Sequence, residues 1–354
     1  MIEIIIPKKK IYGKGSSSQI IKSISNFSNP LIIIDIYFKN NNSEFLNFLN
    51  FKKYNIFFLD TLLEPSTDLI DNYIKKIIQK NLKIDCVVAI GGGSTLDTGK
   101  AISIMLSNDG LTENYVGWNK VKNKAIYKIG IPTIFGTGSE STKTCVLLNK
   151  KNYLKLGINS SESVFDEIIL DYSFINTVPK NQHFYTAMDT FIHSFESLSG
   201  NYRNIFSDNC SEIAMKLFKS SFAEEKLNNE KSNSLLVSAS YFGGLGVASS
   251  FLGLVHPMSA ALSVVFGTKH CISNCIVMRA MKDIYPKYYD EFWAYVEKFK
   301  IDVPKNLCKG LTSEKYNDLH KATIVHEKPL ANFFGEDFKK ILTIDYLSKL
   351  FDKI

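Results

Sequence analysis

The chain has few of the residues and patterns that mark secreted, fibrous or membrane proteins. Its 354 residues include only six cysteines, nine prolines and two tryptophans. Six cysteines in a chain of this length do not form a disulfide scaffold, which favours a reducing compartment. No run of roughly 18 apolar residues occurs, and the opening run IEIII is far too short to span a bilayer. The first residues lack the pattern of a secretory signal, so we expect a cytoplasmic protein.

The excess of positive over negative charge is modest. The chain has 42 Lys and Arg against 35 Asp and Glu, and the net charge of +7 is scattered along the sequence. A nucleic-acid partner would require a basic patch, so this scatter argues against one. It suggests only a modest preference for anionic small molecules. The hydrophobic share of 45% and the charged share of 22% are typical of a soluble globular protein.

The order of short apolar runs predicts two domains. Strands are predicted over 31–37, 55–61, 84–93 and 127–134, and helices over 66–81 and 94–107, which indicates a mostly parallel sheet with helices on both faces. After Pro179 the pattern is helical, over 180–199, 205–222, 232–255, 258–266, 271–283 and 287–299. We therefore predict an α/β domain, mostly a parallel sheet, over residues 1–178, and an all-helical domain over residues 179–354. Because Pro257 biases His256 away from helical geometry, the small-residue helix 232–255 should end at His256.

Four potential metal ligands are the most informative feature of the second half. They are Asp189, His193, His256 and His270, and three of the chain's six histidines are among them. Asp189 and His193 are four residues apart, which places both on one face of a helix. A single buried histidine more often bonds to a carbonyl than to a metal. Three imidazoles with one carboxylate, however, are a complete ligand set for a divalent transition metal.

Other polar residues near these histidines leave alternatives open. Cys271 and Cys275 could complete a metal site, but buried thiols that pack a helix are the favoured interpretation. Glu196 could hydrogen-bond a ligand imidazole, or it could lie on a solvated helix face.

A glycine-rich segment in the first half, AIGGGSTLDTGKAIS, is typical of a phosphate-binding turn between a strand and a helix. Gly91, Gly92 and Gly93 would let a phosphate approach the backbone, and Ser94 with Asp97 resembles a capping box. The third glycine of the common dinucleotide fingerprint is missing, and a tight turn without a ligand is the alternative. Asp35, at the end of a predicted strand, is the candidate for holding a ribose.

A second glycine turn, IPTIFGTGSEST, follows the next predicted strand. It offers hydroxyl groups from Thr133, Thr137 and Ser139. Two such turns at the ends of adjacent strands would line one crevice, which is where α/β sheets bind ligands.

The ordered motifs together resemble the iron-containing (group III) alcohol dehydrogenases, which share their fold with dehydroquinate synthase and glycerol dehydrogenase. The motifs are GGGSxxDxxK, IPTxxGTGSE, a lysine, LD, MDxxxHxxE, GLVHP and a histidine fourteen residues after the histidine of GLVHP. The similarity covers nearly the whole chain. It is greatest with one branch, the bacterial 3-deoxy-α-D-manno-octulosonate 8-oxidases, over 181–204, 254–275 and 326–330.

The resemblance implies a role for each matching residue. A divalent metal, Fe²⁺ or Zn²⁺, would be held by Asp189, His193, His256 and His270. The remaining matches are to cofactor-binding residues: Gly91, Gly92, Gly93 and Ser94 at the pyrophosphate, Asp35 at the adenosine ribose, Asp97 near the nicotinamide amide, Thr133 and Thr137 along the nucleotide, and Lys155 at the nicotinamide ribose. An acidic residue at the ribose favours NAD(H) over NADP(H).

One position departs from the family pattern. Many members have a histidine four residues after the third ligand, often assigned to a proton relay, but this chain has Ala260 there. Lys269, His326 or bound water could replace it. Arg203, Lys269 and His326 are candidates for holding a substrate carboxylate, although Arg203 and Lys269 could also be ordinary surface charges.

These features predict oxidation of a primary alcohol to an aldehyde, with NAD⁺ or oxygen as the acceptor. The branch resemblance implies C8 of 3-deoxy-D-manno-octulosonate as the site of reaction, in a cytoplasmic homodimer that precedes an aminotransferase in making the 8-amino sugar of lipopolysaccharide. The alternatives are a general NAD-dependent iron or zinc alcohol or polyol dehydrogenase, a dehydroquinate synthase-like cyclase, and a non-catalytic structural member.

Overall fold

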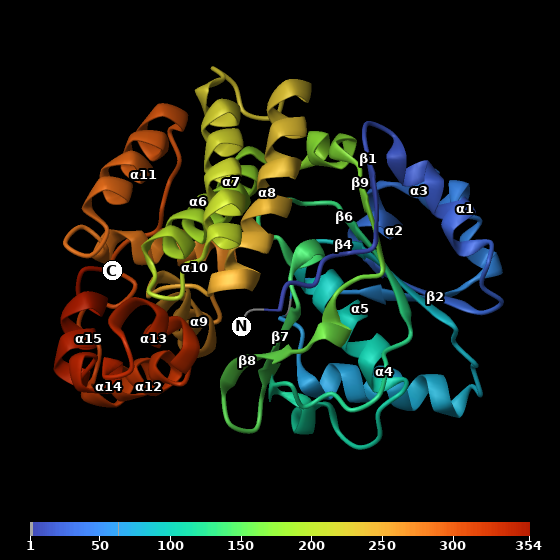
Figure 1. Ribbon diagram of the computed structural model, residues 1–354, viewed down its shortest axis with the longest axis horizontal. Coiled ribbons are helices and arrows are strands. Elements are labelled where there is room, and N and C mark those ends of the chain that lie inside the picture. The colour runs from blue at the N-terminus through green and yellow to red at the C-terminus, as the bar shows by residue number, and fades with distance from the viewer. Residues whose placement is uncertain (1–2, 63) are drawn as a thin grey trace. The chain divides into compact units, whose positions relative to one another are not determined.

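The computed structural model describes residues 3–62 and 64–354, which form two compact units. The first unit comprises residues 3–152 and 156–175, and the second comprises residues 153–155 and 176–354. An α/β unit followed by a helical one confirms the predicted fold class (Figure 1). The predicted division after residue 178 lies close to this boundary. The assignment of 153–155 to the helical unit has no counterpart in the sequence prediction.

A six-stranded parallel sheet forms the centre of the α/β unit. Its strand order is β1-β9-β6-β4-β2-β3. The strands are β1 (Lys9–Tyr12), β2 (Pro30–Asp35), β3 (Asn55–Leu59), β4 (Cys86–Gly91), β6 (Tyr127–Pro132) and β9 (Glu167–Leu170). The four predicted strands correspond to β2, β3, β4 and β6. Because the strands are parallel, their carboxyl ends meet at one edge, where such sheets bind ligands.

Helices cover both faces of this sheet, which explains why its strands are continuous apolar runs. The helices are α1 (Ile20–Ile24), α2 (Tyr37–Asn41), α3 (Ser43–Phe48), α4 (Thr67–Gln79) and α5 (Gly93–Met105). Leu31 and Ile33 of β2 pack in a cluster with residues of α4 and α5, while Ile32 and Ile34 pack with residues of α1 and α2. Successive residues of a strand point to opposite faces, so a sheet covered on both sides is apolar at every position.

A second sheet has the strand order β5-β8-β7. Its strands are β5 (Gly117–Trp118), β7 (Thr144–Asn149) and β8 (Leu154–Asn159), none of which was predicted. Short 3-10 helices connect the elements: η1 (Ser16–Gln19), η2 (Phe51–Lys53), η3 (Thr112–Tyr115), η4 (Ser139–Ser141), η5 (Ser161–Ser163), η6 (Tyr172–Thr177) and η7 (Met278–Ala280).

The second unit is built from helices around one aromatic-rich core. They are α6 (Lys180–Ser199), α7 (Ile205–Ala223), α8 (Glu230–Ser250), α9 (Val255–Phe266), α10 (His270–Val277), α11 (Pro286–Phe299), α12 (Ser313–Ile324), α13 (Glu327–Phe334), α14 (Phe338–Ile341) and α15 (Ile344–Phe351). Helices α6, α7 and α8 lie side by side (Figure 1). Phe184, Phe191 and Phe195 of α6 and Phe218 of α7 are fully buried in the core.

The predicted end of the small-residue helix is wrong. Helix α8 ends at Ser250, because Phe251 has a φ of 97° that a helix cannot continue. His256 therefore lies in the first turn of α9, not at the end of the preceding helix. Pro257 is accommodated because the first turn of a helix does not need the missing N–H group. The helix predicted over 271–283 is also shorter, since α10 ends at Val277.

Among the described residues, no single helix is long and apolar enough to cross a membrane. Helices α8 and α9 reach the required length and apolarity only as a pair, and the pair is bent by 100° at its break.

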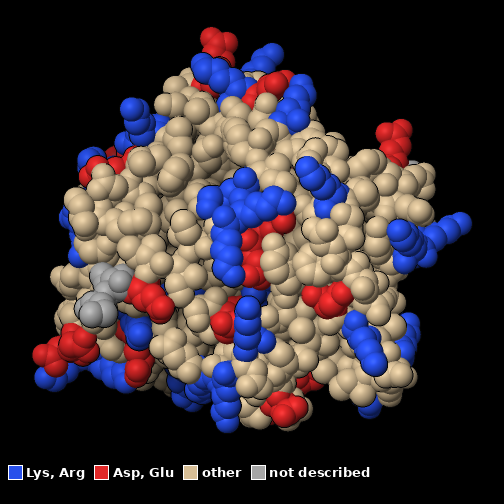
Figure 2. Space-filling view, turned by 45° about the vertical axis from the view of Figure 1, so that its right-hand side comes forward, with Lys and Arg blue, Asp and Glu red and all other residues tan. Residues whose placement is uncertain are grey.

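Charged side chains are dispersed over the face shown in Figure 2, with Asp and Glu among the Lys and Arg residues. Ion pairs among the described residues, on whichever face they lie, include Lys219 with Glu291 at 2.7 Å and Lys353 with Asp283 at 3.0 Å. Exposed pairs of this kind contribute little to stability. The dispersion on this face agrees with the scattered charge of the sequence.

Close packing of α5 on β4 yields a prediction for Gly99. A Cβ atom there would lie 2.5 Å from the Cβ atom of Ala89, so Gly99→Ala must displace the helix or the strand. We expect the free energy of unfolding to fall by about 1–3 kcal/mol, as for other overpacked cores, measured by urea denaturation. The matched control is Gly243→Ala on α8, whose nearest neighbour would be Thr190 Cγ2 at 3.4 Å. It should be neutral or mildly stabilising, since alanine favours a helix. Equal effects of both substitutions would contradict the packing argument.

Candidate metal centre and nucleotide turn

The structure brings the four predicted ligands together in the helical unit. Asp189 and His193 lie on α6, His256 lies in the first turn of α9, and His270 begins α10. The Nε2 atom of His256 is 3.1 Å from an Asp189 oxygen, and the Nε2 atoms of the other two histidines are each 3.6 Å from one. Ligand atoms of Asp189, His256 and His270 lie within 4.8 Å of one another. The His193 ring stacks on that of His256, with centroids 4.6 Å apart.

The Asp189 carboxylate is fully buried, and its ion-pair partners among the described residues are the three histidines. Burial opposes ionisation and would raise its pKa, but the surrounding imidazoles outweigh burial and hold the pKa of Asp189 well below its usual range. A divalent cation would supply the positive charge that a buried carboxylate requires. The oxygen and nitrogen donors suit iron or zinc, so the residues present fit such a metal.

Glu196 orients one of the imidazoles. It is fully buried, and its Oε2 atom lies 2.5 Å from His256 Nδ1 while its Oε1 atom accepts a hydrogen bond from the Val255 N–H at 2.6 Å. Burial opposes protonation of His256, but Glu196 and Asp189 outweigh it and raise the pKa of His256 to about 9. The bond to Nδ1 directs Nε2 toward Asp189, as outer partners of metal-binding histidines do. The interpretation of Glu196 as a solvated residue is wrong.

Asn274 of α10 is a member of this cluster that the sequence analysis missed. Its side-chain nitrogen donates to Asp189 Oδ1 at 2.7 Å and lies 3.3 Å from His256 Nε2. Asn274 is four residues after His270, so both side chains point from the same face of the helix. That spacing was the available sequence signal.

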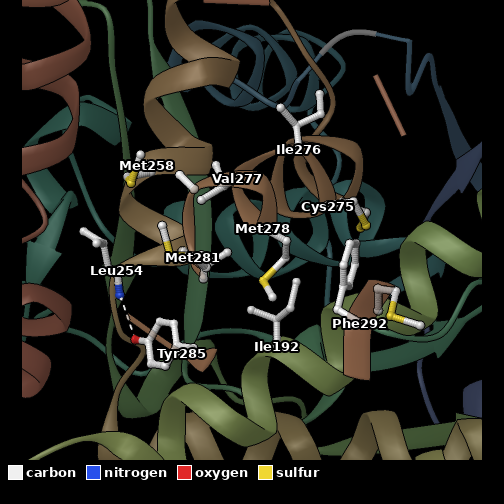
Figure 3. Packing of buried hydrophobic residues seen from close by; sticks show 14 of the residues in the cluster. Ile192, Leu254, Met258, Cys275, Ile276, Val277, Met278, Met281, Tyr285 and Phe292 are labelled. Atoms are coloured by element: carbon white, nitrogen blue, oxygen red, sulfur yellow. Dashed lines mark hydrogen bonds between the residues drawn. The ribbon is translucent and has the colours of Figure 1, made fainter. Parts of the chain in front are cut away.

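Apolar packing fixes the helices that carry the ligands. Figure 3 shows Ile192, Leu254 and Met258, which adjoin the ligands in sequence, within the buried cluster. Tyr285 Oη lies 3.4 Å from the Leu254 N–H group just before α9. Cys275 is fully buried in the same cluster, and burial raises the pKa of its thiol well above the usual value. This agrees with a packing role for Cys275. The Cys271 sulfur is 3.8 Å from an Asp189 oxygen.

The two glycine turns of the α/β unit lie against each other. The Thr133 N–H donates to the Gly91 carbonyl at 3.0 Å. A Cβ atom on Gly93 would lie 3.1 Å from Thr137 Oγ1, so glycine permits this close approach. Helix α5 begins at Gly93, directly after β4, with Ser94 in its first turn. The turns thus form one edge of backbone and hydroxyl groups at the carboxyl ends of β4 and β6.

Asp97 does not cap α5, so the capping-box prediction is wrong. The residue before the helix is Gly92, which makes no side-chain cap. The Asp97 carboxylate instead accepts hydrogen bonds from Ser139 Oγ at 2.6 Å and from the Val146 N–H at 2.9 Å. It therefore ties the second glycine turn and β7 to α5. Its predicted place near the nicotinamide remains a prediction.

Asp35 lies at the carboxyl end of β2, where the ribose was predicted. One oxygen accepts from the Tyr37 N–H and the other from Thr61 Oγ1, both at 2.9 Å. A carboxylate oxygen has two acceptor positions, so Asp35 is held in place and can still accept from ribose hydroxyls.

The residues proposed for the substrate have different environments. Arg203 forms a two-point pair with Asp208, at 2.9 and 3.1 Å, so a substrate carboxylate would compete with Asp208. Lys269 is exposed directly before His270. His326 precedes α13, and its buried Nε2 atom has no hydrogen-bond partner among residues 3–62 and 64–354. Burial first, and then the charges of Lys155 and His256, lower the pKa of His326 to about 4.

Comparison with known families adds independent findings. Residues 7–172 match the family model of iron-containing alcohol dehydrogenase, and residues 183–324 match the C-terminal model of the same family. The chain is 34% identical over 209 residues to the sulfoacetaldehyde reductase of Bilophila wadsworthia, covering 58% of this chain and 54% of that protein. It is 29% identical over 280 residues to the 4-hydroxybutyrate dehydrogenase of Clostridium kluyveri, covering 76% and 72%. The matched segment thus spans about half the length of the first of these relatives.

Solved structures share the fold. A 1,3-propanediol oxidoreductase superposes with a TM-score of 0.84 at 18% identity, over 98% of this chain and 100% of that chain. Sulfoacetaldehyde reductase from Bifidobacterium kashiwanohense, solved with NAD⁺, gives a TM-score of 0.82 at 22% identity, over 99% and 98%. At these identities the likeness establishes the fold.

The ligand cluster predicts the effect of His193→Ala. Removing this imidazole should leave a folded protein that loses its metal, with a larger loss of affinity than the roughly 10- to 100-fold caused by removing an outer hydrogen-bond partner. Elemental analysis and thermal unfolding measure the two properties. The control is His183→Ala, a buried histidine on the same helix that bonds to Asn233. It should retain the metal. Full metal occupancy in His193→Ala would remove His193 from the ligand set.

The position of Asp35 predicts a preference for NAD over NADP, since a carboxylate would repel a 2′-phosphate. We expect Asp35→Ser to reduce this preference by roughly tenfold, the equivalent of one 1.4 kcal/mol interaction. Titration calorimetry with both nucleotides tests it. Asp60→Ser is the control, because Asp60 follows the adjacent strand β3 and accepts a local hydrogen bond from the Leu62 N–H. Equal affinity of the wild type for NAD and NADP would exclude this role for Asp35.

Proposed function

This chain belongs to the iron-containing alcohol dehydrogenase family, and we propose that it is a metal-dependent enzyme that oxidises a primary alcohol to an aldehyde with NAD⁺. The observation that carries the proposal is the convergence of three imidazoles on the fully buried Asp189 carboxylate. The paired glycine turns at the sheet edge support the nucleotide part of the proposal.

The proposed metal would be held by Asp189, His193, His256 and His270, with Glu196 orienting His256. A divalent cation at this point lowers the pKa of a bound alcohol, as it does for water. The protein's own contribution is to hold the imidazoles with their lone pairs inward and to exclude water through the apolar cluster behind them. Asp35 and Gly91–Ser94 would hold the nucleotide.

His326 is the residue that we propose as the proton acceptor in place of the histidine absent at Ala260. Its lowered pKa of about 4 keeps the imidazole neutral near pH 7, so a lone pair is available. Among the described residues its Nε2 atom has no hydrogen-bond partner, so the lone pair is not already engaged. Burial is the main cause of this lowered pKa, and the charge of Lys155, which the resemblance assigns to the nicotinamide ribose, lowers it further.

The substrate that we propose carries an acid group remote from its alcohol. Two relatives are named for such molecules, since sulfoacetaldehyde and 4-hydroxybutyrate each have an anionic group at one end and the reacting carbon at the other. The net charge of +7 and the exposed Lys269 beside His270 suit an anion. The C8 hydroxyl of 3-deoxy-D-manno-octulosonate meets this description, and the motif resemblance makes it our specific proposal. A homodimer and a downstream aminotransferase belong to the same proposal.

The substrate proposal predicts turnover of 3-deoxy-D-manno-octulosonate by the metal-loaded protein. The aldehyde would be trapped with a hydrazine, with NAD⁺ or air as the acceptor, and NADH formation would be followed by absorbance. We expect an 8-aldehyde product. Lys269→Gln should raise KM for the sugar acid by roughly tenfold, as the loss of one charged contact would, while leaving KM for a neutral alcohol unchanged. Lys282→Gln, a change after η7, is the matched control.

Other outcomes would point to the alternative functions. Turnover of propanediol or glycerol with none of the sugar acid would exclude the specific substrate and favour a general alcohol or polyol dehydrogenase. A product formed without net NADH or oxygen consumption would favour a cyclase, because a cyclase regenerates its cofactor. Failure to bind any metal would favour a non-catalytic role.

A further inference from the structure

The side-chain nitrogen of Asn274 lies close to three of the four proposed metal ligands. Its side-chain nitrogen is 2.7 Å from Asp189 Oδ1, 3.3 Å from His256 Nε2 and 3.5 Å from His270 Nε2. These three atoms are donors that the proposed metal would use. Asn274 is fully buried, and its Oδ1 atom has no hydrogen-bond partner in the part of the chain that the structure describes.

The chemistry of an amide explains this arrangement. If the amide were reversed, its oxygen would face the Asp189 carboxylate, and two acceptors would lie against each other. The nitrogen must therefore face Asp189, with one hydrogen for the carboxylate and a second for an imidazole lone pair. The His270 Nε2 atom lies 3.5 Å from the same nitrogen, on the side of the second hydrogen.

We propose that Asn274 is a positioning residue that takes the place of the metal cation in the metal-free protein. Its two N–H groups satisfy the ligand atoms and keep them converged until a cation replaces the amide at the imidazole lone pairs. This inference rests on the proposed metal centre and deepens it, since it gives the metal-free state a defined structure. A residue that stabilises only the metal-free state must lower the affinity for the metal.

The test is a zinc titration of metal-free wild type and Asn274→Ala, by calorimetry, with thermal unfolding of both forms. Zinc is used because it is redox-inert. We expect Asn274→Ala to bind Zn²⁺ about tenfold more tightly, the equivalent of one hydrogen bond to a charged group. Its melting temperature should fall more in the metal-free form than in the zinc-loaded form. If Asn274 merely supported the fold, its removal would lower both melting temperatures equally and leave the affinity for zinc unchanged.

Asn233→Ala is the matched control. Asn233 is a fully buried asparagine on α8 that bonds to Asn176, Asn228 and His183, none of them a proposed ligand. Its loss should destabilise both forms equally without changing zinc affinity.

Asn274→Asp provides a second measurement, because a carboxylate beside Asp189 cannot donate. It should fold poorly without metal and recover on refolding with Zn²⁺. Unchanged or weaker zinc binding by Asn274→Ala, or failure of both variants to fold even with Zn²⁺, would overturn the proposal. If the wild type itself bound no zinc, the proposed metal centre would fail as well. The two failures can be told apart, because zinc binding by the wild type tests the metal centre, whereas the difference between the wild type and Asn274→Ala tests the role of Asn274.

Discussion

A carboxylate buried among histidines is the constraint on which the helical unit depends. Asp189 has no exposed surface, and removing an ion from water costs several kcal/mol unless nearby charge and hydrogen bonds offset it. The compensating groups come from three helices, α6, α9 and α10. The positions of these helices must therefore be fixed relative to the two carboxylate oxygens of Asp189. The apolar cluster that includes Ile192, Met258 and Ile276 supplies that rigidity. Packing and electrostatics therefore fix the same geometry.

Helix α6 organises the centre because its polar residues recur on one face. His193 and Glu196 lie four and seven residues after Asp189 along the helix, so the three side chains project in one direction. Glu196 also bonds to the first N–H of α9, which joins the two helices through a buried polar contact. The other faces of α6 are aromatic, and Phe184, Phe191 and Phe195 fill the core. One helix thus serves both the site and the fold.

The sequence predicted features that depend on local patterns and missed those that depend on tertiary contacts. The strands at 31–37 and 84–93 were predicted because strands covered on both faces are continuous apolar runs. Strands β7 and β8 belong to a smaller sheet, with partly buried and fully buried residues mixed, and gave no such signal. The end of α8 depends on the single backbone angle of Phe251. The ligands had a spacing that could be recognised, whereas Asn274 is an ordinary helix residue until α6 and α9 are placed beside it.

The position of two proposed ligands at helix starts gives a reason for the second buried carboxylate of the centre. His256 lies in the first turn of α9 and His270 begins α10, and the N–H groups there carry partial positive charge. That charge disfavours a cation nearby. Glu196 counters it at α9, because it accepts the Val255 N–H and also binds His256. With the histidines neutral, Asp189 and Glu196 together would carry two negative charges, which would balance one divalent cation and make the buried centre electrically neutral.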